Sequence, residues 1–90
     1  MAMTGGRLTP AQIRRLKQIR SERSNRLREA RRLAKMTQVE VAAAMGITQP
    51  MLSDFERQRW MRTSVDVARR FAEFYGCAIE DLFPARQAVA

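Results

Sequence analysis

The 90-residue sequence contains no histidine and a single cysteine, Cys77. A lone cysteine cannot form an intrachain disulfide, and without histidine it leaves no ligand set for a zinc site. We therefore expect neither a metal nor another cofactor, and we interpret Cys77 as a small buried apolar residue. So little cysteine is typical of a protein of the reducing cytoplasm.

Long apolar runs are also absent. The longest, residues 41–47, is far shorter than the roughly 20 residues that a membrane-spanning helix needs. The first residues lack the apolar segment of a signal peptide. Nor does the chain contain a phosphate-cradling glycine loop, or a nucleophile with a base beside it. We therefore expect a cytoplasmic protein that does not contact a membrane and is not an enzyme.

Acidic residues are few, nine against seventeen arginines and lysines, and the formal net charge is +8. The excess is uneven, because residues 1–35 hold eleven cations and two acids, whereas residues 36–90 hold six cations and seven acids. Fifteen of the cations are arginine, whose planar guanidinium suits phosphates and base edges. The first third of the chain therefore predicts a polyanionic partner, nucleic acid ahead of a membrane surface.

Strand-forming β-branched and aromatic residues are sparse, while alanine, leucine, arginine, glutamate and glutamine are plentiful. This composition favours helices over strands, and the length suits one domain. We expect an all-α domain over residues 24–84, a basic N-terminal arm and helical extension over residues 1–23, and a flexible tail over residues 85–90. Residues 1–8 show no periodicity and are predicted to be a flexible arm.

The first predicted helix begins after Thr9, which can cap it, with Pro10 at the first helical position. A stripe of apolar residues at a spacing of three follows, formed by Ile13, Leu16 and Ile19. The stripe is expected to pack on the domain or on another subunit. Residues 21–24 lack apolar side chains and are a candidate break; without a break, one helix would run to about Lys35.

The next two predicted helices have clear ends. One begins near Asn25 and has its apolar face at Leu27, Ala30, Leu33 and Ala34. Thr37 and Glu40 then form a capping box, and Gly46 ends the helix that this box opens. The inner face of that helix is predicted to hold Val39, Ala42, Ala43 and Met45.

Three more helices are predicted after Gly46. Thr48 can cap a helix over residues 49–56, with Leu52 and Phe55 facing inward. After a loop, Thr63 or Ser64 caps a helix that ends at Gly76. Its inner face is predicted to hold Val65, Ala68, Phe71, Ala72 and Tyr75. A short last helix over residues 79–83 ends before Pro84.

Residues 38–56 combine the features of a helix-turn-helix, in which two short helices are joined by a turn of three or four residues that contains glycine. Gly46 supplies the positive φ of the turn, and the small Ala42 and Ala43 allow the two helices to cross closely. Ile47 and Leu52 fill the angle between them. Because the motif requires all of these residue types together over about twenty residues, the pattern is far more specific than a single arginine cluster.

Residues 25–84 resemble the Cro and phage-repressor type of helix-turn-helix domain. The matching stretches are RLREAR at 26–31, MTQVEVA at 36–42, GITQ at 46–49, LSDFER at 52–57, ARRFAEFYG at 68–76 and IEDLFP at 79–84. The resemblance implies a lambda-repressor-like fold of five helices, here with an extra N-terminal basic helix or arm. One departure is Gln58, which stands where many family members have glycine, so the loop of residues 57–62 is expected to differ.

The resemblance also implies roles for single residues, with the helix over residues 49–56 in the major groove of double-stranded DNA. Gln38 would contact the DNA backbone and brace Gln49, which would pair with an adenine edge. The neighbouring groove-facing positions are Pro50, Met51 and Asp54. The candidates for phosphate contacts are Thr48, Ser53, Arg57, Arg59 and Arg62. Arg31 and Glu56 match a structural ion pair of the family.

Some phage repressors carry a basic arm that wraps the DNA, and this role would fall to Arg7, Arg14, Arg15 and Lys17. The family binds palindromic DNA as a twofold dimer. We therefore expect a homodimer, with the interface on the C-terminal surface around Phe74, Tyr75, Ile79 and Phe83.

The predicted function is transcriptional regulation, and repression is favoured because blocking polymerase needs no extra surface. Two alternatives are an antitoxin or adaptor that binds a protein partner on the same fold, and an arginine-rich RNA-binding helix over residues 10–35.

Overall fold

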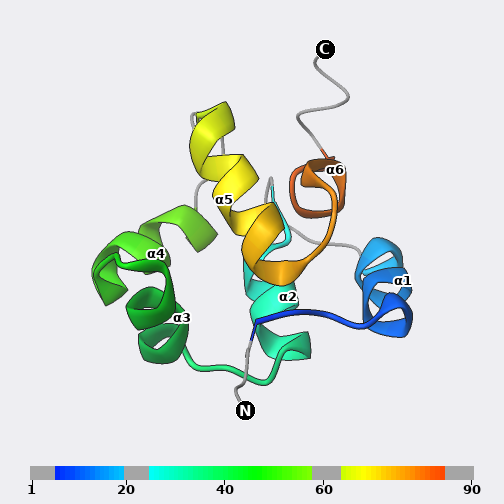
Figure 1. Cartoon of the computed structure of the whole chain (residues 1–90), viewed down its shortest axis with the longest axis horizontal. Helices are drawn as coiled ribbons and strands as arrows, with labels where there is room; N and C mark the ends of the chain where they lie inside the picture. Colours follow the sequence, from blue (N-terminus) through cyan, green and yellow to red (C-terminus); the bar gives the residue numbers. More distant parts are fainter. Residues whose placement is uncertain (1–5, 20–24, 58–63, 85–90) are drawn as a thin grey trace.

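The computed structural model describes residues 6–19, 25–57 and 64–84, and these residues form six α-helices and no strand. The helices are α1 (Pro10–Gln18), α2 (Leu27–Leu33), α3 (Gln38–Met45), α4 (Gln49–Arg57), α5 (Val65–Tyr75) and α6 (Ile79–Leu82). In Figure 1, α3 and α4 lie at one end of the long axis, α1 lies at the other, and α2 lies between them. The predicted all-α class is confirmed.

The predicted helix ends are set by local side-chain bonds. The Thr9 and Thr37 hydroxyls accept from the backbone N–H groups of Gln12 and Glu40, each at 3.1 Å, and both capping boxes are complete. Ser64, one of the two residues predicted to cap α5, accepts from the Val67 N–H at 3.2 Å. Since each cap involves residues only three positions apart, these helix starts can be predicted from the sequence alone.

The helix α1 is separate from α2 and packs on the rest of the domain. It ends at Gln18, because Ile19 has extended backbone angles, which supports the break rather than one long helix. Leu16 is fully buried, and Ile13 and Ile19 pack against the core. The apolar stripe of α1 therefore meets its own chain, which is one of the two alternatives that the sequence leaves open.

Polar bonds hold α1 in place at both of its ends. The Gln12 side-chain amide donates to the carbonyl of Leu33, at the end of α2, at 3.0 Å. At the other end of α1, the Arg26 guanidinium donates to the carbonyls of Ile19 and Lys17 at 3.1 and 3.2 Å. Satisfying the free carbonyls at helix ends in this way fixes the position of α1.

Part of the predicted flexible arm is held on the core. Leu8 is only 5% exposed, and its N–H donates to the carbonyl of Tyr75 at 2.9 Å. Gly6 lies so close to the Phe74 ring that a Cβ atom would fall 2.3 Å from it. The prediction of a flexible arm as far as residue 8 is therefore wrong for residues 6–8, because a contact with residues almost seventy positions away leaves no local pattern in the sequence.

The predicted inner face of α3 is also partly wrong. Val39 is 65% exposed and Ala43 is exposed, whereas Val41 is fully buried beside Ala42 and Met45. At 100° per residue, Val41, Ala42 and Met45 fall within one 100° arc, and Val39 and Ala43 fall outside it. Because apolar residues occur on every side of α3, its sequence does not select a face. Val65, at the exposed start of α5, is 49% exposed and was likewise wrongly predicted to face inward.

Candidate nucleic-acid interface

The turn between α3 and α4 has the expected geometry. Gly46 ends α3 with a φ of 73°, and the Ile47 N–H donates to the Ala42 carbonyl at 3.0 Å. Thr48 then starts α4, because its hydroxyl accepts from the Met51 N–H at 3.2 Å. Leu52 is fully buried and anchors α4 against the core, so the opposite face of α4 is turned to solvent.

That outer face gathers most of the residues predicted to contact DNA. Thr48, Gln49, Pro50, Asp54 and Arg57 are all exposed, and Ser53 between them is half-buried. Met51 is 46% exposed and lies at the edge of the face. There it lines a small apolar cavity of about 80 Å³ between α3, α4 and α5. Part of its side chain therefore packs inside the protein and does not face solvent.

Asp54 and Arg57 pair with each other on this face. The Arg57 guanidinium lies 3.1 Å from the Asp54 carboxylate, and both side chains are largely exposed. An exposed pair of this kind contributes less than about 1 kcal/mol and opens easily. Arg57 is therefore available to a phosphate, and in the free protein it offsets the charge by which Asp54 would repel the DNA backbone.

A chain of hydrogen bonds runs from the core to Gln49. The Arg31 guanidinium donates to the Glu56 carboxylate at 2.7 and 3.2 Å, which confirms the predicted ion pair. The Gln38 side-chain Nε2 donates to the same carboxylate at 3.0 Å. The Gln49 Nε2 in turn donates to the Gln38 Oε1 at 2.6 Å. Gln38 thus braces Gln49, and its own orientation is set by a buried carboxylate.

A helix-turn-helix family model matches residues 27–82, which is more than half of the chain. The protein belongs to the Cro/C1-type helix-turn-helix family. This family consists of DNA-binding regulatory domains that are not typically enzymatic, so the chain is a DNA-binding transcription regulator by family. No curated protein and no solved structure matches the chain significantly.

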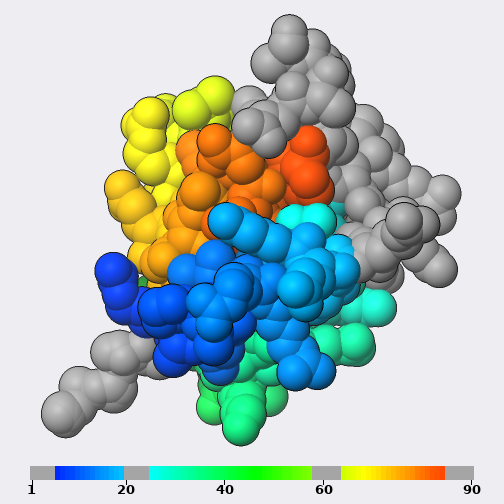
Figure 2. All heavy atoms as spheres, turned by 90° about the vertical axis from the view of Figure 1, so that its right-hand side faces the viewer, coloured from blue at the N-terminus to red at the C-terminus, as the bar shows by residue number. Residues whose placement is uncertain are grey.

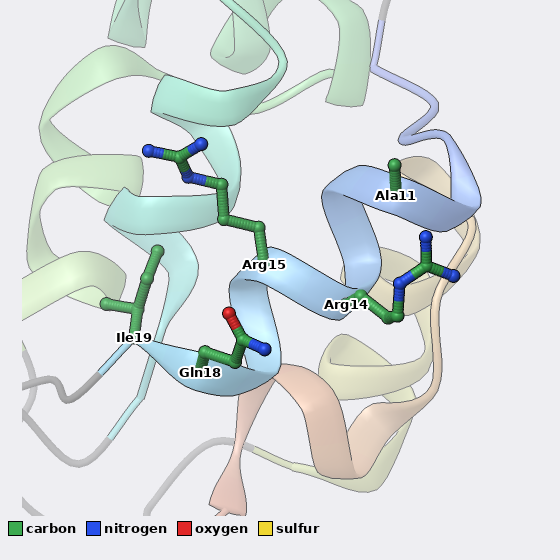
Figure 3. A pocket seen from close by; sticks show the side chains of 5 residues that line it. All are labelled: Ala11, Arg14, Arg15, Gln18 and Ile19. Atoms are coloured by element: carbon green, nitrogen blue, oxygen red, sulfur yellow. The ribbon is translucent and has the colours of Figure 1, made fainter.

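The family match begins at α2, so α1 lies outside this helix-turn-helix domain as the family defines it. Arg14 and Arg15 are exposed on α1 and, with Ala11, Gln18 and Ile19, line a shallow depression (Figure 3). The two arginines project in different directions. Figure 2 shows that α1 spreads over the face of the molecule turned away from α3 and α4 in Figure 1. The structure therefore does not bring Arg14 and Arg15 together with the outer face of α4.

The other cations predicted to contact DNA are placed differently. Lys17 lies 3.7 Å from the Asp81 carboxylate, and Arg7 packs along Gly76 on the α5 side. Arg59 and Arg62 lie outside the described residues, as does Gln58, where the sequence departs from the family. Among the predicted phosphate-binding arginines in the described part of the chain, Arg57 alone lies on α4.

The predicted dimer surface is not available as expected. Tyr75 and Phe83 are 0% and 1% exposed, and Phe74 and Ile79 are partly buried against the same core. The reason is that α6 folds back on α5, and the N-terminal segment at Gly6 and Leu8 covers Phe74 and the end of α5. The packing of residues 6–8 on this face joins residues almost seventy positions apart, so it leaves no local pattern from which it can be predicted.

The phenol of Tyr75 beside the ion pair was not predicted from the sequence. Burial raises the pKa of Tyr75, and the nearby negative charge of Glu56 raises it further. Its hydroxyl has no hydrogen-bond partner among residues 6–19, 25–57 and 64–84. Burial likewise raises the pKa of Cys77 to about 12. The sequence predicts a small buried apolar residue at this position, and Cys77 is only partly buried.

None of the described helices is long and apolar enough to cross a membrane. Within residues 6–19, 25–57 and 64–84, no three acidic or cysteine side chains gather closely enough to hold a metal ion.

Proposed function

We propose that the protein is a sequence-specific transcriptional regulator that reads double-stranded DNA with the outer face of α4. The observation that carries this proposal is Gln49, which is exposed at the start of α4 and held by Gln38 at 2.6 Å. A glutamine amide fixed in this way offers an acceptor and a donor together, the pattern that pairs with adenine in the major groove. Holding the side chain before binding also reduces the entropy lost when the complex forms.

The rest of the outer face has supporting roles in this proposal. Pro50 and Met51 pack against thymine methyl groups, and Asp54 accepts from a cytosine amino group when Arg57 leaves it. Arg57, Thr48 and Ser53 bind the flanking phosphates, together with Arg59 and Arg62, which follow α4 in the sequence. Gln38, at the start of α3, donates its second amide hydrogen to the DNA backbone.

We propose further that the protein acts as a homodimer on a palindromic operator and represses transcription. With nine residues, α4 is about 13 Å long and spans only a few base pairs. Two copies of α4, about one helical turn of DNA apart, would read enough sequence to be specific. A dimer bound across a promoter blocks polymerase without any further surface. Footprinting and sedimentation of the complex test both the spacing and the stoichiometry.

Replacing Gln49 with alanine is expected to remove the discrimination between bases at one or two base pairs. The loss of discrimination at each base pair is about 1–3 kcal/mol. The site is first selected from a random duplex library with the unaltered protein. Competition binding then compares single-base variants of that site. Val39→Ala is a suitable control, because Val39 is exposed on α3 and has no role in the proposed contact. Unchanged base preference in Gln49→Ala would refute the assignment of Gln49 as the base reader.

We propose further that α1 makes no direct contact with the DNA phosphates. Arg14 and Arg15 belong to α1, which lies at the opposite end of the molecule from α4 (Figure 1), and their field is screened over about 8–10 Å at physiological salt. We expect the double variant Arg14→Gln, Arg15→Gln to leave the slope of log affinity against log salt nearly unchanged. Arg57→Gln should reduce that slope by about 0.9, the value for one phosphate contact. If the slope of the α1 double variant falls by the value for two phosphate contacts, α1 contacts the DNA directly and this proposal is wrong.

A further inference from the structure

The buried carboxylate of Glu56 lies at the start of the hydrogen-bond chain that ends at Gln49. Its side chain is 2% exposed, and it accepts two bonds from Arg31 and one from Gln38. Gln38 links it to Gln49, which is the only exposed member of the chain and the proposed base reader. The four residues come from α2, α3 and α4, so the chain connects three helices.

These bonds have a fixed direction. A carboxylate has only acceptor atoms, so Gln38 must turn its amide nitrogen toward Glu56. The carbonyl oxygen of Gln38 then faces Gln49, and it can only accept. Gln49 must therefore turn its own nitrogen toward Gln38 and use one of its two N–H groups there. Its carbonyl oxygen and its second N–H remain for DNA.

We infer that Glu56, acting through Gln38, is a specificity-determining residue that makes Gln49 prefer adenine over guanine. This inference rests on the proposed function. Adenine presents N7 as an acceptor and N6 as a donor, so it matches one free N–H and one carbonyl oxygen. Guanine presents two acceptors, N7 and O6, and Gln49 has only one N–H left to donate. Glu56 contacts no base and is a positioning residue.

The isosteric variant Glu56→Gln tests this directional effect. A glutamine at position 56 can donate or accept, so Gln38 can adopt either amide orientation. In the reversed orientation Gln38 donates to the Gln49 oxygen, and both N–H groups of Gln49 are free for the two acceptors of guanine. The variant is therefore expected to lose discrimination between adenine and guanine, whereas Gln49→Ala loses discrimination among all bases at that position.

The measurement is the ratio of dissociation constants for two duplexes that differ only by adenine or guanine at the position read by Gln49. We expect a ratio of about 5- to 150-fold for the unaltered protein, the range for one bidentate contact. We expect Glu56→Gln to bring the ratio to within about twofold of one. Partial unfolding changes both constants by the same factor, so it cancels in the ratio even if the variant is less stable.

A destabilised control separates orientation from stability. Leu16→Val weakens the core at α1, far from α4, and should leave the ratio unchanged while lowering the stability. If Glu56→Gln keeps the full ratio while Gln49→Ala loses it, the role of Glu56 is refuted and the proposed function stands. If the unaltered protein shows no preference for any duplex sequence, the proposed function fails, and this inference fails with it.

Discussion

Replacing Arg31 with alanine is expected to lower the free energy of unfolding by about 3–5 kcal/mol. The guanidinium is the main partner of the Glu56 carboxylate, at 2.7 and 3.2 Å, and also donates to the Met36 carbonyl at 3.2 Å. With Arg31 gone, Glu56 keeps a single bond to the described residues, from Gln38, while remaining buried. A buried charge without a countercharge is among the most costly single defects in a protein.

A matched control is available in the exposed pair of Asp54 and Arg57. Each ion pair joins an arginine to a carboxylate, but the side chains of Asp54 and Arg57 are 73% and 66% exposed, against 2% and 13% for Glu56 and Arg31. Arg57→Ala should therefore change the stability by less than about 1 kcal/mol. Urea denaturation followed by circular dichroism measures both variants. Equal losses in the two variants would contradict the burial of the Arg31 pair.

A double variant distinguishes the loss of a countercharge from the loss of packing. Arg31→Met with Glu56→Leu removes both charges and keeps similar side-chain volumes. Replacing a buried ion pair with apolar residues is often neutral or stabilising, so this variant should recover most of the stability lost in Arg31→Ala. Failure to recover would mean that the aliphatic part of Arg31, rather than its charge, holds α2 against α4.

The second large expected effect concerns α1. Leu16→Ala is expected to lower the free energy of unfolding by about 2–5 kcal/mol, although α1 lies outside the family match. Leu16 is fully buried, and its removal leaves a cavity between α1 and the core formed by residues of α2 and α6. Since small domains are only marginally stable, a loss of this size is a large fraction of the total.

Arg14→Ala is the matched control for Leu16→Ala. Arg14 lies on the same helix two residues earlier and is exposed, and surface substitutions of this kind usually stay within about 0.5 kcal/mol. Thermal melts of the two variants should therefore separate clearly. If Leu16→Ala melts at the same temperature as the unaltered protein, α1 would be a peripheral helix, and the stability of the domain would not depend on it.

The features that the sequence predicts well are local ones. The Thr9 and Thr37 capping boxes and the left-handed Gly46 each depend on residues within four positions of one another, and each lies where it was expected. The α3–α4 motif was therefore predicted together with its turn. Arg31 and Glu56 are 25 positions apart, and their pairing was predicted because the family resemblance supplied it, not because of any local pattern.

The features that the sequence misses depend on contacts between distant residues. Leu8 packs against the end of α5, almost seventy positions away, and α6 packs on α5, so Tyr75 and Phe83 are buried rather than part of the surface predicted for dimerisation. Apolar residues occur on every side of α3, so its sequence gives no signal for choosing Val41 over Val39 as the buried residue. In the site, the contact between Gln49 and Gln38 is present as expected, and their contacts with DNA stay a prediction.

The bonds that join the two ends of the described chain have a consequence for synthesis on the ribosome. The N–H of Arg26 donates to the carbonyl of Leu82 at 2.7 Å, and Lys17 on α1 pairs with Asp81 on α6. The partners of α1 on α6 are therefore among the last residues of the domain to emerge, whereas its partners on α2 follow it closely. Domains fold as units, and contacts distant in sequence form late. The side of α1 that meets α6 would then stay uncovered until translation has passed residue 82.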